Sequence, residues 1–107
     1  MSSRRESKGP FTVAVTDTDS TTQVLTIKEY AGGSVEIPSG SPLTSLTMYA
    51  CHNSEQTPVE LFDKDGGNTT ITVAANGCYE LPESVFTVPY LAFLGDNTNT
   101  ITAYFKS

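Results

Sequence analysis

A succession of short runs in which apolar and polar residues alternate constrains the fold of this chain more than any other feature. Clusters of Asp, Asn, Gly and Pro separate five such runs, which span 46–49, 59–62, 71–73, 90–94 and 101–105. Alternation with a period of two is typical of strands with one buried face. Turn clusters about every eight to twelve residues indicate an antiparallel sandwich or barrel. The sequence therefore predicts an all-β fold.

The whole pattern predicts a single antiparallel, jelly-roll-like β-sandwich of about eight strands. The expected strands span 11–16, 23–30, 34–38, 43–50, 58–63, 69–74, 78–81, 90–94 and 100–106. A Pro at the start of 82–86 favours a single helical turn there. Gly32 and Gly33 predict a tight reversal, and hairpins are expected around Asn76–Gly77 and Asp96–Asn97.

The charge distribution divides the chain of 107 residues into an arm, 1–10, and one sandwich domain, 11–107. Arg4, Arg5 and Lys8 are half of the six Lys and Arg residues, and eleven of the twelve carboxylates follow Gly9. The net charge of −6 argues against general nucleic-acid binding. The basic segment is either a flexible terminus or an arm that contacts a neighbouring subunit or an acidic surface.

No apolar run approaches the ~20 residues that span a membrane, and no apolar core follows the basic N-terminal residues as in a signal peptide. Cys51 and Cys78 allow one disulfide or two thiols. Because no export signal is recognised, buried free thiols are favoured.

The candidate catalytic and metal-binding residues form no recognisable constellation, so neither an enzyme nor a cofactor is expected. His52 is the only histidine and directly follows Cys51. Adjacent strand residues point to opposite faces, which places this pair poorly for a dyad. The close carboxylate pairs Glu55/Glu60 and Glu80/Glu83 show no sign of lying on facing elements, as a glycosidase requires.

The segment Asp63–Asn68 superficially resembles a calcium loop. Gly occupies its fourth and fifth positions, and Ala74 stands at the twelfth, where an EF-hand has Glu. The EF-hand interpretation therefore fails. A looser oxygen-ligand site that uses Asp63 and Asp65 and a plain Asp-Gly turn are the two alternatives.

The chain has five Tyr residues and no Trp. Tyr combines an apolar ring face with a polar tip, which suits partial core burial, a sugar-stacking platform or an oligomer interface. The candidate surface or interface aromatics are Tyr30, Tyr49, Tyr90 and Tyr104.

Residues 34–107 carry a pattern of strands and turns that resembles a known group of proteins. The pattern consists of Leu46-x-x-Tyr49, Pro58-Val-x-Leu61-x-Asp63-x-Asp65-Gly66, Thr70-Ile-Thr-Val-Ala-Ala-x-Gly77, Tyr79-x-Leu81-Pro82, Leu91-x-Phe93-Leu94 and Thr100-Ile-Thr-Ala-Tyr-Phe. It resembles small all-β structural proteins encoded among the virion genes of tailed bacteriophages, many of them near the major capsid protein gene. The pattern is also similar to the discoidin or galactose-binding jelly roll, from which this chain departs by lacking Trp and by having Pro89 before Tyr90.

The resemblance implies a non-enzymatic capsid decoration or cement protein on the outside of a phage head. Its expected partners are the major capsid protein and further copies of the chain, with assembly in the cytoplasm of the bacterial host. Arg4, Arg5 and Lys8 are the expected capsid or subunit contacts, and no metal, nucleic acid or membrane is expected. The alternative is a carbohydrate-binding sandwich module.

Overall fold

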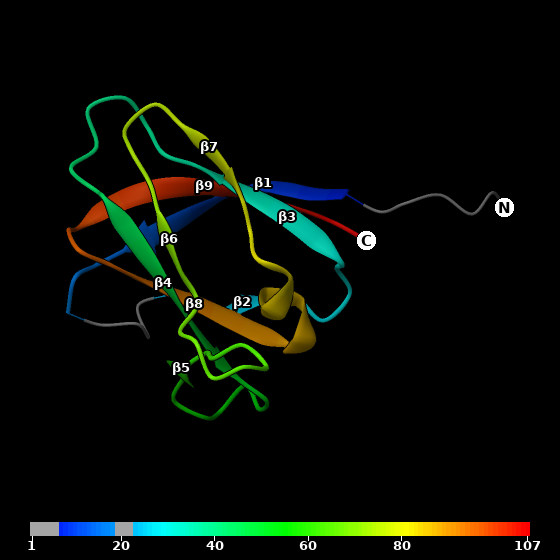
Figure 1. The fold of residues 1–107 in the computed structure, drawn as a ribbon. Helices are drawn as coiled ribbons and strands as arrows, with labels where there is room; N and C mark the ends of the chain where they lie inside the picture. Colours follow the sequence, from blue (N-terminus) through cyan, green and yellow to red (C-terminus); the bar gives the residue numbers. More distant parts are fainter. Residues whose placement is uncertain (1–6, 19–22) are drawn as a thin grey trace, which may run out of the picture.

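The computed structural model describes residues 7–18 and 23–107 and contains two antiparallel sheets packed face to face (Figure 1). The sandwich expected from the alternating pattern is confirmed. The described residues form nine strands and one 3₁₀ turn: β1 Ser7–Val15, β2 Leu25–Thr26, β3 Gly32–Glu36, β4 Ser45–Cys51, β5 Val59–Glu60, β6 Thr70–Thr72, β7 Cys78–Glu80, η1 Glu83–Thr87, β8 Tyr90–Gly95 and β9 Asn99–Lys106.

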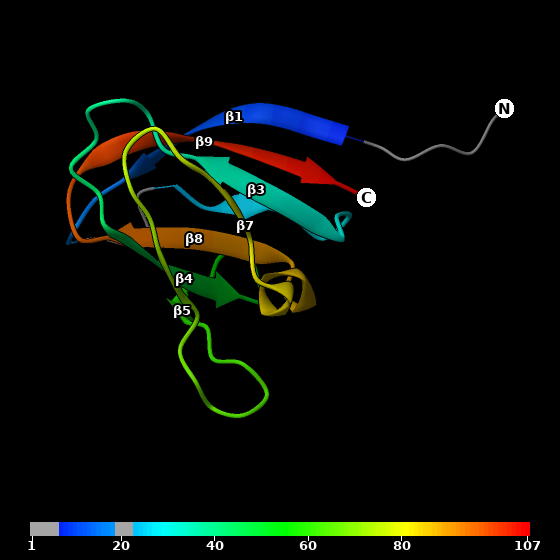
Figure 2. The same cartoon turned by 45° about the horizontal axis from the view of Figure 1, so that its top comes forward.

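The first sheet has the strand order β1-β9-β3-β7, and the second has the order β2-β8-β4-β5, with β6 also paired to β4. Figure 2 shows the two layers, with β1, β9 and β3 above β8 and β4. Most connections cross from one sheet to the other, so strands that are consecutive in sequence mostly lie in different layers. No helix in the ranges 7–18 and 23–107 is long and apolar enough to cross a membrane.

The core lies between the two inner faces and follows the predicted alternation. On β4, Leu46 and Met48 are fully buried and Ala50 nearly so, whereas Thr47 and Tyr49 are only half-buried on the outer face. Phe105 of β9 is the largest fully buried side chain. Its ring centroid lies 6.0 Å from that of Phe11, 5.4 Å from that of Tyr30 and 6.4 Å from that of Phe86. This cluster joins β1, β9 and η1 at one end of the sandwich.

The two expected hairpins are wrong, although the chain does turn at both places. Asn76 adopts the left-handed conformation, with φ 64°, but its turn joins β6 of the second sheet to β7 of the first. The turn after β8 likewise leads to β9 in the other sheet. The Asn-Gly sequence favours a reversal of the backbone, but it does not determine which strands the two flanking segments pair with.

Two strands differ in length from the prediction. The expected strand 23–30 is reduced to Leu25–Thr26, because the N–H of Tyr30 bonds the carbonyl of Ile27 and bends the chain into a turn. Conversely, β1 begins at Ser7, four residues before the expected start at Phe11, and pairs there with Lys106 of β9. The first sheet therefore reaches into the segment that was assigned to the arm.

The cysteines confirm only part of the prediction. Both are free thiols, and Cys51 is buried as expected. Cys78 is exposed, because β7 is the last strand of its sheet and the alternation turns Tyr79, not Cys78, toward the core.

Candidate functional site

The predicted arm residues fall largely outside the described part of the chain. Arg4 and Arg5 lie outside the described residues, and Lys8 lies in β1 opposite Phe105. The arm therefore starts from the edge of the first sheet, because β1 is the outermost strand there.

The four candidate tyrosines are not brought together as one set. Tyr49 and Tyr90 lie on the outer face of the second sheet, where Tyr49 is opposite Ala92 and Tyr90 is opposite Cys51. Tyr104 is 38% exposed on the outer face of the first sheet, on the other side of the molecule. Tyr30 stacks on Phe105 with an interplanar angle of 14° and belongs to the border of the core.

The outer face of the second sheet is free of charge over β2, β8, β4 and β6. The cross-strand register places eight uncharged residues there: Thr26, Tyr90, Ala92, Leu94, Thr47, Tyr49, Cys51 and Thr70. Ala92 and Cys51 are buried although they point outward, since their cross-strand partners Tyr49 and Tyr90 flank them. We refer to these eight residues as the uncharged face, and Glu60 of β5 lies opposite Tyr49 at its border. In a chain with twelve carboxylates, such a face has the composition of a protein contact surface.

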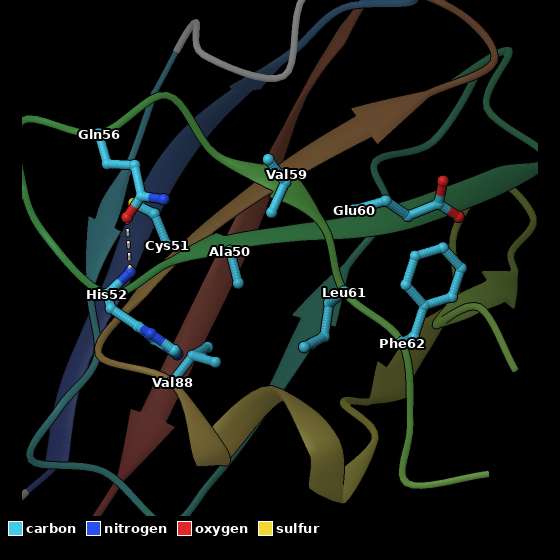
Figure 3. A pocket seen from close by; sticks show the side chains of 9 residues that line it. All are labelled: Ala50, Cys51, His52, Gln56, Val59, Glu60, Leu61, Phe62 and Val88. Atoms are coloured by element: carbon cyan, nitrogen blue, oxygen red, sulfur yellow. Dashed lines mark hydrogen bonds between the residues drawn. The ribbon is translucent and has the colours of Figure 1, made fainter. Parts of the chain in front are cut away.

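A groove lies beside β5 at the end of the sandwich that η1 closes. Its lining includes the apolar side chains of Ala50, Val59, Leu61, Phe62 and Val88 (Figure 3). In Figure 3, Phe62 and Glu60 lie at one end of this groove, with His52 and Gln56 at the other. We call it the β5 groove.

Two side chains of the β5 groove are unusually exposed for their type. Val59 is 60% exposed and Phe62 is 54% exposed, the two highest values among the large apolar side chains of the described residues. β5 is only two residues long, and the chain then turns at Asp63, so neither side chain is covered by a further strand. The alternation in 58–63 had suggested an ordinary strand. The adjoining turn cluster was the available signal that this strand ends early.

A second, wider hollow adjoins the first at Phe62, with a volume of about 730 Å³. It is lined by Phe62, Asp63, Lys64, Asp65, Glu83, Ser84 and Thr87. Asp65 and Glu83 make no ion pair with any described Lys or Arg. We call this the acidic hollow, because it sets three carboxylates and one ammonium group beside an exposed aromatic ring.

The remaining candidates lie in a loop and a turn. The backbone N–H of His52 bonds the side chain of Gln56 at 3.3 Å. Asp63 Oδ1 accepts the N–H groups of Asp65 and Gly67, each at 2.9 Å, so this segment forms the turn that was one of the two alternatives. Within 7–18 and 23–107, no group of three or more His, Cys, Asp or Glu residues is arranged to hold a metal ion.

Asp96 accepts several hydrogen bonds that lower its pKa. The hydroxyl and the N–H of Thr44 donate to its carboxylate, and the N–H of Ser45 adds a weaker bond, which together lower the pKa of Asp96. Asp96 thereby ties the turn after β8 to the start of β4. This is a structural role, so the site is defined by its two surfaces, the uncharged face and the grooves around Phe62.

Comparison with known proteins shows a likeness in fold. No protein-family model and no curated protein matches this sequence. Among solved structures, the chain is similar to the SPBc2 prophage-derived protein YomS, with a TM-score of 0.64 and 14% sequence identity. The likeness covers 100% of this chain and 98% of YomS. At this identity the likeness shows the fold alone.

Proposed function

We propose that this chain is a non-enzymatic structural protein of a phage virion, which decorates the outside of the capsid shell. The observation that carries the proposal is the fold shared over nearly the full length of a prophage-derived protein. The virion-protein pattern in residues 34–107 supports the same assignment. The proposed partners are the major capsid protein and further copies of the chain, with no nucleic acid and no membrane.

The uncharged face is the surface that we assign to the shell. Docking centred on Tyr90 and Leu94 removes Tyr49, Tyr90 and Leu94 from water and leaves Glu60, opposite Tyr49 at the border, in solvent. No unpaired charge is then buried, which would cost several kcal/mol. Each copy contributes a modest contact, and many symmetric copies on one shell make the total large. The net charge of −6 keeps the particle surface hydrated. Arg4, Arg5 and Lys8 would supply a second contact, with the shell or with a neighbouring subunit.

The first test measures the protein composition of purified phage particles. Particles of the phage whose genome encodes this chain are purified, and quantitative mass spectrometry measures its copy number against the major capsid protein. We expect a fixed ratio of many copies per particle, set by the symmetry of the shell. Purified particles that lack the chain would overturn the proposal.

The second test assigns the surface. Particles stripped of the protein are titrated with purified wild type, with Leu94→Lys on the uncharged face, and with Thr102→Lys on the outer face of the first sheet as the matched control. We expect Leu94→Lys to weaken binding at least about tenfold and Thr102→Lys to leave it unchanged. Equal binding by all three would exclude the uncharged face. Binding to a glycan panel that is lost in a Tyr49→Ala/Tyr90→Ala variant would favour the carbohydrate-binding alternative instead.

A further inference from the structure

We infer that the grooves around Phe62 bind the basic N-terminal segment, Met1–Glu6, of a second copy of this chain. The inference rests on the proposed function only for the idea of a homo-oligomer and needs no shell. The contact would be head to tail, with the arm of one subunit in the groove of the next. Repetition of such a contact closes a ring if the rotation allows it.

The chemistry of the acidic hollow fits the arginine side chain. A guanidinium group pairs with carboxylates through a planar fork of donors and also stacks on aromatic faces. The hollow offers both partners at one place, since Asp65 and Glu83 line it together with the ring of Phe62, which is 54% exposed. Neither carboxylate is already occupied by a described cation.

The apolar lining of the β5 groove would add a hydrophobic contact to the charge pairing in the acidic hollow. Val59 and Phe62 are both more than half exposed. A segment that crosses them would cover apolar surface while it places its cations against the acidic hollow. The volume of the hollow, about 730 Å³, is enough for several side chains.

The chain itself supplies a matching segment. Arg4 and Arg5 are two of only six Lys and Arg residues, and they are the only arginines. The other basic residues are Lys8, Lys28, Lys64 and Lys106, of which Lys64 already lies in the hollow. The charge of the arm is thus complementary to the surface around Phe62.

A second copy is a better donor than the same chain, because β1 and β5 lie at opposite edges. Gln23, just before β2, bonds β1, so β2 lies next to β1, whereas β5 is at the far end of the second sheet. Figure 2 shows β1 at the top and the segment after β5 at the bottom. From β1 to β5, a path around the surface covers about 10 Å between the two layers and about 14 Å across the four strands of the second sheet. Arg4 is three residues from Ser7, roughly 10 Å of extended backbone.

The test uses reversal of charge on either side of the proposed contact. The arm variant is Arg4→Glu/Arg5→Glu and the hollow variant is Asp65→Lys/Glu83→Lys. Asp63 is left unchanged because it holds the turn. The matched control is Glu36→Lys/Glu80→Lys, which makes the same change of charge on the outer face of the first sheet. All replaced groove and control residues are exposed, so folding should be retained and is checked by circular dichroism.

Sedimentation equilibrium over a range of protein concentrations measures self-association of each variant. We expect the wild type to associate, more weakly as salt rises. The arm and hollow variants should each lose at least about tenfold in affinity, and the control should keep the affinity of the wild type to within about threefold. Phe62→Ala, which leaves every charge in place, should also weaken association.

An equimolar mixture of the arm and hollow variants decides which copy provides the arm. Each reversed arm then finds a groove of opposite charge on the other variant, so the mixture should associate at least about tenfold more tightly than either variant alone. A wild type that stays monomeric at every concentration, or a mixture that stays monomeric, would overturn the inference. Shell binding is measured separately, so either proposal can fail while the other stands.

Discussion

The two sheets of this sandwich differ in what they present to the outside. The outer face of the first sheet carries Glu36, Glu80 and Lys106, and its edge strand β1 is bonded by the side chain of Gln23. On the outer face of the second sheet, the eight residues of the uncharged face are neutral, with Glu60 at the border opposite Tyr49, and Val59 and Phe62 are exposed beside it. One sheet is built to remain in water, and the other has the composition of a surface that becomes covered. The comparison supports the proposed contact on the second sheet.

The largest effect we expect is the difference in stability between a substitution on the inner face of β9 and one on its outer face. Phe105→Ala removes the ring that Phe11, Tyr30 and Phe86 surround and should lower the free energy of unfolding by about 3–5 kcal/mol. Tyr104→Ala, its neighbour on the outer face of β9, should cost less than about 1 kcal/mol. Urea unfolding of both variants measures the difference. Equal losses would contradict the assignment of these residues to opposite faces.

The inner faces were largely predictable from sequence, because burial on one side of a strand leaves a period of two. Leu46, Met48 and Ala50 alternate with Thr47 and Tyr49 as expected. The pairing of strands was less accessible. The turns at Asn76–Gly77 and Asp96–Asn97 connect different sheets, and each flanking strand has an apolar side in either arrangement. Local turn chemistry therefore could not distinguish a hairpin from a crossover.

The candidate surfaces were predictable only in part. Tyr49 and Tyr90 were recognised as candidate surface aromatics, but that they share a face while Tyr30 and Tyr104 do not depends on the register between strands. Val59 and Phe62 read as ordinary strand residues, and their exposure follows from the early end of β5. Features made by tertiary arrangement leave no periodic trace in the chain.

A smaller effect is expected where Asp96 ties the second sheet together. Asp96→Asn keeps an acceptor but loses the charge that strengthens the bonds from Thr44 and Ser45, so we expect a loss of about 1 kcal/mol at neutral pH. Thermal or urea unfolding of the two proteins at matched salt measures it. Thr100→Ala, at an exposed position on the outer face of the first sheet, is the control and should be nearly neutral.

The pH dependence of this difference has a definite sign. Since the pKa of Asp96 is lowered in the folded protein below its ordinary value of 3.8, the carboxylate stabilises the fold above that value. That stability declines as the pH falls below 3.8 and is lost as it passes the lowered, folded-state pKa. The gap between wild type and Asp96→Asn should therefore be constant at neutral pH and narrow in acid. A gap that is unchanged in acid would show that the carboxylate charge contributes nothing.

The smallest effect concerns the edge that the first sheet protects. The Gln23 carboxamide accepts a bond from the N–H of Ala14 at 3.0 Å and donates one to the carbonyl of Thr12 at 3.1 Å, as a neighbouring strand would. Pro10 and a register irregularity between Lys8 and Phe11 interrupt the edge further along β1. Gln23→Ala should cost about 0.5–1 kcal/mol in stability and speed hydrogen exchange of the Ala14 amide severalfold.

Replacement of Gln23 by Glu tests whether both bonds of the carboxamide matter. A carboxylate still accepts from the Ala14 N–H but has no hydrogen to donate to Thr12, so Gln23→Glu should protect the Ala14 amide while leaving the Thr12 carbonyl open. The two hydrogen bonds of Gln23 would keep β1 from pairing with other chains. In that case Gln23→Ala should increase self-association even when the arm carries Arg4→Glu/Arg5→Glu. If neither the hydrogen exchange of the Ala14 amide nor the molecular mass in solution changes in that background, Pro10 and the irregular register protect the edge without Gln23. The contrast between the two sheets would then rest on their outer faces alone.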